Sequence, residues 1–152
     1  MKTIQVSAFA ISILIALMAS LPGSANDNEE DEAENEVTIE KLTLVKDTGT
    51  DFQPVKVFKP ADTFGVLVQL SEAVEGTEVK GVWTAIAAGE MRNKKIFEKK
   101  VEFTPEENDN AKNPSRIDFT LAHDDPYPAG HYKFDVYLNG KLTDTIAFTV
   151  KE

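Results

Sequence analysis

The chain has 152 residues, no cysteine, and a formal net charge of −10 at pH 7. The absence of cysteine excludes disulfide bonds, thiol catalysis and thiolate metal sites. A chain with this net negative charge is also a poor ligand for phosphate backbones, so we expect no nucleic-acid partner.

The first segment, residues 1–25, has the organisation of a cleavable secretory signal peptide. Lys2 supplies a positive charge, and Ile4–Leu21 is a mainly apolar run without a charged residue. Pro22-Gly23 then breaks the run before the small residues Ser24-Ala25. About 18 apolar residues can also span a bilayer as an anchor, but the helix-breaking and small residues favour cleavage. We therefore expect a periplasmic or secreted protein whose mature form has no membrane span.

The negative charge is concentrated directly after this leader. Residues 26–36 carry seven of the 26 acidic residues and no basic one, which leaves 19 acidic and 15 basic residues for 37–152. Such a run repels itself and has no large apolar side chain, so it predicts an acidic disordered linker. Loose binding of a divalent cation or a basic partner is the alternative. Residues 37–152 have the usual size of one domain.

Beyond Glu36, apolar and polar residues alternate, and turn residues recur at short intervals. This pattern predicts an all-β, antiparallel sandwich of about seven or eight strands and no helix. The first strand changes parity near Glu40-Lys41, which predicts a bulge, and Pro54 marks the next extended segment as an edge. The strands are expected at 37–45, 55–58, 64–71, 79–86, 96–103, 117–121, 132–138 and 142–150.

The last two predicted strands flank Asn139-Gly140, a dipeptide typical of two-residue hairpin turns. Their apolar residues are all even-numbered, however, and a two-residue loop would set each even residue opposite an odd one. A three-residue loop with Gly140 in the left-handed region would pair Val136 with Leu142 and Tyr132 with Ile146. Burying each such side chain is worth about 1.5–3 kcal/mol, so we predict the three-residue loop. The even residues concerned are Tyr132, Phe134, Val136, Leu138, Leu142, Ile146, Phe148 and Val150.

Two positions carry a resemblance to a known architecture. Trp83 lies on a predicted central strand, and "PAGHY" (Pro128–Tyr132) puts a tyrosine at the start of the penultimate strand. In both respects the chain resembles the immunoglobulin-like or fibronectin-like β-sandwich modules of bacterial exported proteins. The resemblance implies an immunoglobulin-like sandwich for 37–152. It implies no functional residue, because a fold does not specify a function.

The segment "HDDPYPAGH", His123–His131, contains both histidines of the chain and two acids. Imidazole and carboxylate groups together suit zinc or copper(II), so the candidate ligands are His123, Asp124, Asp125 and His131. Asp124-Asp125-Pro126 is equally typical of a tight turn, and the spacing matches no recognised ligand signature. A structural loop, a metal site and a pH-sensitive contact all remain open.

A second segment, "RNKKIFEKK" (Arg92–Lys100), carries five bases and one acid. It could hold an anionic polymer, a membrane surface or the acidic segment of the same chain. It could equally be the solvated face of an exposed hairpin, whose lysines discourage edge-to-edge pairing.

Catalysis has little support in the sequence. Ser71 and Ser115 are the only serines after the leader, and neither lies in a nucleophile-elbow context. No pair of carboxylates stands out for glycoside hydrolysis. We expect an exported, non-catalytic module without a cofactor that binds an extracytoplasmic protein or a surface polymer. The alternative is a periplasmic metal-handling protein that binds zinc or copper through the His123–His131 loop.

Overall fold

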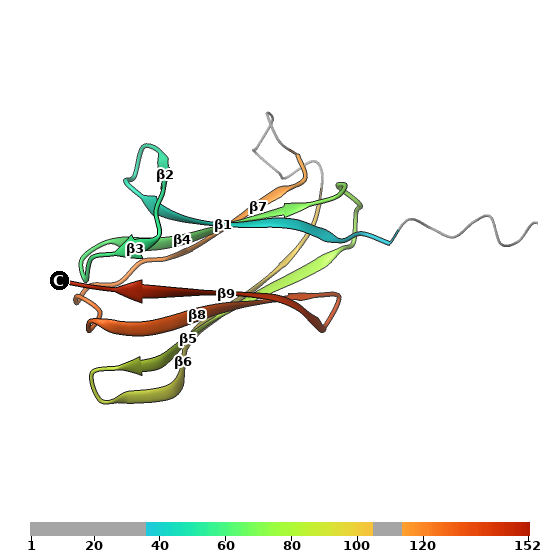
Figure 1. The fold of residues 1–152 in the computed structure, drawn as a ribbon. Coiled ribbons are helices and arrows are strands. Elements are labelled where there is room, and N and C mark those ends of the chain that lie inside the picture. The colour runs from blue at the N-terminus through green and yellow to red at the C-terminus, as the bar shows by residue number, and fades with distance from the viewer. Residues whose placement is uncertain (1–35, 105–113) are drawn as a thin grey trace, which may run out of the picture. The chain divides into compact units, whose positions relative to one another are not determined.

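The computed structural model describes residues 36–104 and 114–152. Within it, Val37–Glu152 form one unit. The predicted signal peptide and residues 26–35 of the predicted linker lie outside the described residues. The described part contains nine strands and no helix, arranged as two sheets that enclose one core (Figure 1). This confirms the prediction of an all-β sandwich. No helix among the described residues has the length and apolar character that a membrane span requires.

The first sheet has four antiparallel strands. Their order across the sheet is β2 (Phe52–Pro54), β1 (Ile39–Asp47), β4 (Thr63–Leu70) and β7 (Arg116–Leu121).

The second sheet has five strands, of which β3 runs parallel to β9 and the others are antiparallel. Their order is β3 (Val57–Phe58), β9 (Lys141–Val150), β8 (Gly130–Leu138), β5 (Glu78–Ala88) and β6 (Met91–Glu102). Of the edge strand predicted at 55–58, only Val57–Phe58 form a strand, and β2 before it was not predicted. β2 lies on an edge of one sheet and β3 on an edge of the other. Because Pro54 lacks an amide proton, it suits such a position.

The predicted bulge in the first strand is confirmed. Ile39 pairs with Leu70, whereas Lys41 already pairs with Gln69, so Glu40 is an extra residue in β1. The extra residue inverts the alternation, which lets apolar side chains on both sides of the bulge face the same core.

The hairpin between β8 and β9 corrects the prediction for its loop. Asn139 and Gly140 have φ angles of 50° and 85°, as the two-residue type I′ turn requires. Leu138 pairs with Lys141 across this turn. The loop therefore has two residues, and the predicted three-residue loop is wrong.

The extra residue that the parity of the two strands requires lies inside β9 instead of in the loop. Tyr137 pairs with Leu142, but Val136 pairs with Asp144, so Thr143 forms a bulge. The predicted pairs of Val136 with Leu142 and of Tyr132 with Ile146 are wrong for this reason. Beyond the bulge, even residues do oppose even residues: Tyr132 lies opposite Phe148.

The conclusion drawn from parity is confirmed for Phe134 and Phe148 and is wrong for Leu142, which lies before the bulge and is 51% exposed. Phe134 and Phe148 are both buried in the shared core, because the bulge returns β9 to the phase that its apolar residues need.

The centre of the core is aromatic. The ring centroid of Phe64, on β4, lies 4.7 Å from that of Phe58 and 5.4 Å from that of Phe148. Trp83 is 1% exposed and packs on Phe134 at 4.7 Å between centroids. Rings from both sheets thus meet in one cluster, as aromatic pairs in a sandwich core do.

The architecture is immunoglobulin-like. The strands β1, β4 and β7 occupy the places of strands A, B and E of that fold, and β5, β8 and β9 those of C, F and G. Trp83 is buried on β5, and the hydroxyl of Tyr132 donates a hydrogen bond to the carbonyl oxygen of Pro128. Both features on which the resemblance depended are therefore present.

Candidate functional site

His123 lies at the end of β7, where the chain leaves the four-stranded sheet. Its Nδ1 is 2.6 Å from the carbonyl oxygen of Asp125, and its Nε2 is 2.9 Å from the carbonyl oxygen of Asp62. Carbonyl oxygens only accept hydrogen bonds, so a neutral imidazole serves one of them at a time and an imidazolium serves both. His123 thus joins its own loop to the turn before β4. A metal ion would need a ring nitrogen turned away from these carbonyls.

Tyr127 reinforces the same connection. Its amide donates to the carbonyl oxygen of Pro60 at 3.0 Å, and its ring lies 4.4 Å from the His123 ring and 5.2 Å from the Phe64 ring, between centroids. Burial raises the pKa of the Tyr127 phenol. This end of the sandwich is therefore a packed, hydrogen-bonded loop junction.

The other predicted ligands are placed differently. His131 is exposed at the start of β8, and its Nδ1 is 3.5 Å from Thr149 Oγ1. Asp124 and Asp125 are exposed. In the part of the chain that the structure describes, no three or more His, Cys, Asp or Glu side chains come together as a metal site. The structure does not favour the zinc or copper hypothesis, which stays a prediction.

Asp62 carries the main ion pair of the loop junction. Its carboxylate, 10% exposed, lies 2.7 Å from Lys46 Nζ and accepts a hydrogen bond from the Lys59 amide at 2.8 Å. Burial alone would raise the pKa of Asp62, but the hydrogen bonds from Lys46 and Lys59 and their positive charges outweigh it and lower the pKa. The carboxylate is therefore held ionised.

The outer face of the five-stranded sheet carries a second polar group. Asp135, on β8, is buried on this face. It accepts a hydrogen bond from Thr145 at 2.6 Å and lies 3.0 Å from Lys133 Nζ. Further along, Lys80 Nζ lies 4.4 Å from the centroid of the Tyr137 ring. The charges in the middle of this face are thus satisfied within the sheet.

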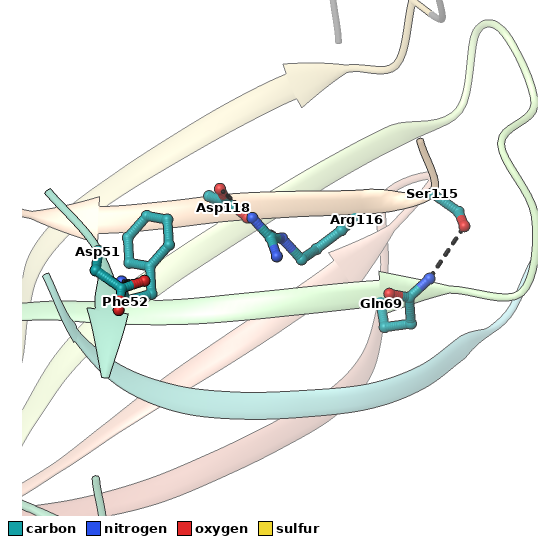
Figure 2. Close-up of polar contacts among 6 residues, drawn as sticks. All are labelled: Asp51, Phe52, Gln69, Ser115, Arg116 and Asp118. Carbon is teal, nitrogen blue, oxygen red and sulfur yellow. Dashed lines mark hydrogen bonds and ion pairs between the residues drawn. The ribbon is translucent and has the colours of Figure 1, made fainter. Parts of the chain in front are cut away.

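The outer face of the four-stranded sheet has local polar contacts as well (Figure 2). Arg116 pairs with Asp118 through two hydrogen bonds of 2.8 and 3.2 Å, and its guanidinium lies 5.9 Å from the Phe52 ring centroid. Gln69 donates to the Ser115 hydroxyl at 3.0 Å. These contacts join β4, β7 and β2 and supply no assembled reactive group.

The basic segment predicted from the sequence forms most of β6, an outermost strand of its sheet (Figure 1). Lys95 pairs with Glu98 at 3.0 Å and Lys100 with Glu78 at 3.2 Å. The hydrogen bond and charge of Lys95 lower the pKa of Glu98. Lys94 and Lys99 are exposed and form no ion pair with the described residues.

Sequence reasoning missed the partners of the histidines. Asp62 is 61 residues from His123, and a local pattern carries no signal for a contact at that separation. The start of β6 at Met91 was also missed, because Arg92 to Lys95 interrupt the apolar alternation on an exposed strand.

No protein-family model and no curated protein sequence matches the chain. An immunoglobulin-like protein from Pseudomonas aeruginosa is similar in structure, with a TM-score of 0.47 and 18% identity, over 78% of this chain and 99% of that one. The alkylpurine DNA glycosylase AlkC of Pseudomonas fluorescens is similar over 77% of this chain and 31% of its own length, with a TM-score of 0.44 and 13% identity.

Proposed function

We propose that this protein is an exported, non-catalytic binding module that holds an acidic partner protein by adding one of its extended segments to β6. Export rests on the leader predicted at residues 1–25. The observation that carries the proposal is the position of β6: it is long, basic and outermost in its sheet.

The edge of β6 offers main-chain hydrogen bonds. The strand has twelve residues and pairs with β5 along one side only, and no described strand lies on its other side. An outermost strand presents unpaired N–H and C=O groups to any extended segment that reaches it, which is the basis of recognition by strand addition.

The side chains of β6 favour a partner segment of negative charge. Lys94 and Lys99 form no ion pair with the described residues, and Phe97, 42% exposed, lies between them in the strand. An opposing acidic residue would gain roughly 0.2–1 kcal/mol per cross-strand pair, whereas a second basic strand would be repelled. The lysines therefore disfavour pairing between two copies of β6 and favour an acidic segment.

The proposal is tested by calorimetric titration with a short peptide that alternates glutamate and valine. We expect binding that weakens as salt is added, because exposed charges are screened. The double variant Lys94→Glu/Lys99→Glu should abolish it. The control Lys41→Glu/Lys151→Glu, which makes the same change in net charge away from β6, should bind normally.

Two outcomes contradict the proposal. One is equal loss of binding in both double variants, which would show a response to net charge alone. The other is tighter binding of dextran sulfate than of the peptide, since a polymer without amide groups cannot add a strand. That result would assign the edge to a surface polymer instead.

A further inference from the structure

A hollow of about 430 Å³ lies on the outer face of the five-stranded sheet. Four segments build it: the residue before β3, the end of β5, the start of β8 and the end of β9. The residues that matter for its chemistry are Lys56, Ile86, His131, Ala147 and Thr149. Its volume lies in the range of about 300–1,000 Å³ that small-ligand sites occupy.

The register of the sheet explains why these residues converge. Thr149 lies opposite His131 on β8 and opposite Val57 on β3, so the side chains of these three residues share one face of the sheet. A bulge in β5 makes Ile86 an extra residue, and Ala87 then pairs with His131. The bulge brings an isoleucine to a position beside the histidine.

The hollow combines cationic and polar groups with an apolar lining. Lys56 is exposed and, like Lys94 and Lys99 on β6, forms no ion pair with the described residues. No acidic residue lines the hollow. An ammonium group, an imidazole and the Thr149 hydroxyl therefore line the hollow together with the apolar side chains of Ile86 and Ala147.

We infer that this hollow binds a small organic anion with an apolar body, such as an aliphatic carboxylate. Its carboxylate would lie against Lys56, with His131 and Thr149 as hydrogen-bond donors, and its apolar part would cover Ile86 and Ala147. Opposite charge and apolar contact then act together, as in ligand sites with a few convergent polar groups. The inference goes beyond the function proposed for β6 and does not depend on it.

The test is a titration of the isotope-labelled protein with octanoate, followed by the amide chemical shifts. The largest changes should fall on Ile86, His131, Ala147 and Thr149. Octan-1-ol, which has the same apolar length without the charge, should bind more weakly. Lys56→Gln should weaken octanoate binding by about two- to five-fold, the range of an exposed charge pair, and leave octan-1-ol binding unchanged.

Two further variants make the result decisive. Ala147→Glu places a carboxylate in the hollow at an exposed position and should abolish the shift changes. Lys41→Gln removes the same charge on the other sheet and should bind octanoate normally. Shift changes that fall outside the hollow, equal binding of octan-1-ol and octanoate, or equal weakening by Lys41→Gln would each overturn the inference. Charge reversal on β6 should leave octanoate binding intact, which separates this site from the strand-binding edge.

Discussion

The hydroxyl of Tyr132 donates a hydrogen bond to the carbonyl oxygen of Pro128, with 2.6 Å between the two oxygens. Burial and then the neighbouring Tyr127 raise the pKa of Tyr132 to about 12, so the phenol stays protonated and able to donate at ordinary pH. This bond closes the turn that leads into β8, where the backbone of Gly130 has a φ of 151° and packs against Ala88.

Replacing Tyr132 with phenylalanine should remove this bond and keep the ring packing. We expect the free energy of unfolding to fall by about 1–2 kcal/mol, because the carbonyl of Pro128 loses its donor. Urea denaturation at pH 7 measures the change. Tyr137→Phe, on the outer face of the sheet, is the control and should change stability much less. An equal effect of both variants would contradict a specific role for the bond from Tyr132 to Pro128.

Asp62→Asn should change the pH dependence of the free energy of unfolding. The pKa of Asp62 is lowered from its ordinary value of 3.8, so its contribution is fully present above that value and is lost as the pH falls through the folded-state pKa. The difference in unfolding free energy between wild type and Asp62→Asn should therefore be constant from pH 7 to about 5 and shrink at lower pH. Asp124→Asn, an exposed carboxylate, is the control. A difference that grows as the pH falls would contradict the assignment.

His123→Ala should loosen the loop junction. The substitution removes the hydrogen bonds to Asp62 and Asp125 and the packing on Tyr127, which should lower the free energy of unfolding by about 1–3 kcal/mol. His131→Ala removes an exposed side chain and should have a smaller effect. The same two variants test the metal hypothesis. Micromolar binding of zinc or copper(II) that both variants abolish would contradict the structural role assigned to His123.

Gly81→Ala should destabilise the core. A Cβ at Gly81 would overlap the ring of Phe134 and crowd Phe119, and a packed interior cannot absorb that volume without moving both rings. We expect a loss of about 1–3 kcal/mol by thermal or urea denaturation. Gly76→Ala is unsuitable as a control because Gly76 has a positive φ. Ala122→Gly, at an exposed position, is better. An unchanged stability of Gly81→Ala would contradict the packing described.

The sequence predicted the faces of the strands better than their connections. The alternation at Phe64, Val66 and Val68 predicted one buried face, and all three are fully buried. Burial of one face specifies the register of a strand, because a slip of one residue would turn its apolar side chains to solvent. The hairpin shows the limit. The parity of the apolar residues required one extra residue near Asn139-Gly140, but it did not determine whether the loop or a bulge at Thr143 would supply it.

The site was less predictable than the fold. The sequence showed that His123 and His131 delimit one segment, and His123 lies beside Phe64 after the end of β7. Its carbonyl partner at Asp62 and the position of Lys56 near His131 depend on the turns before β3 and β4, whose approach to β8 and β9 no local pattern encodes. The basic character of Arg92–Lys100 was visible in the sequence. Its placement at the sheet edge required the strand order.

The most direct test of the proposed function is amide hydrogen exchange of β6 with and without the glutamate–valine peptide. Strand addition predicts that the β6 amides that do not bond to β5 become protected when the peptide is added, while the amides of β2 and β7 exchange as before. Unchanged exchange along β6, or protection confined to another edge, would contradict the account.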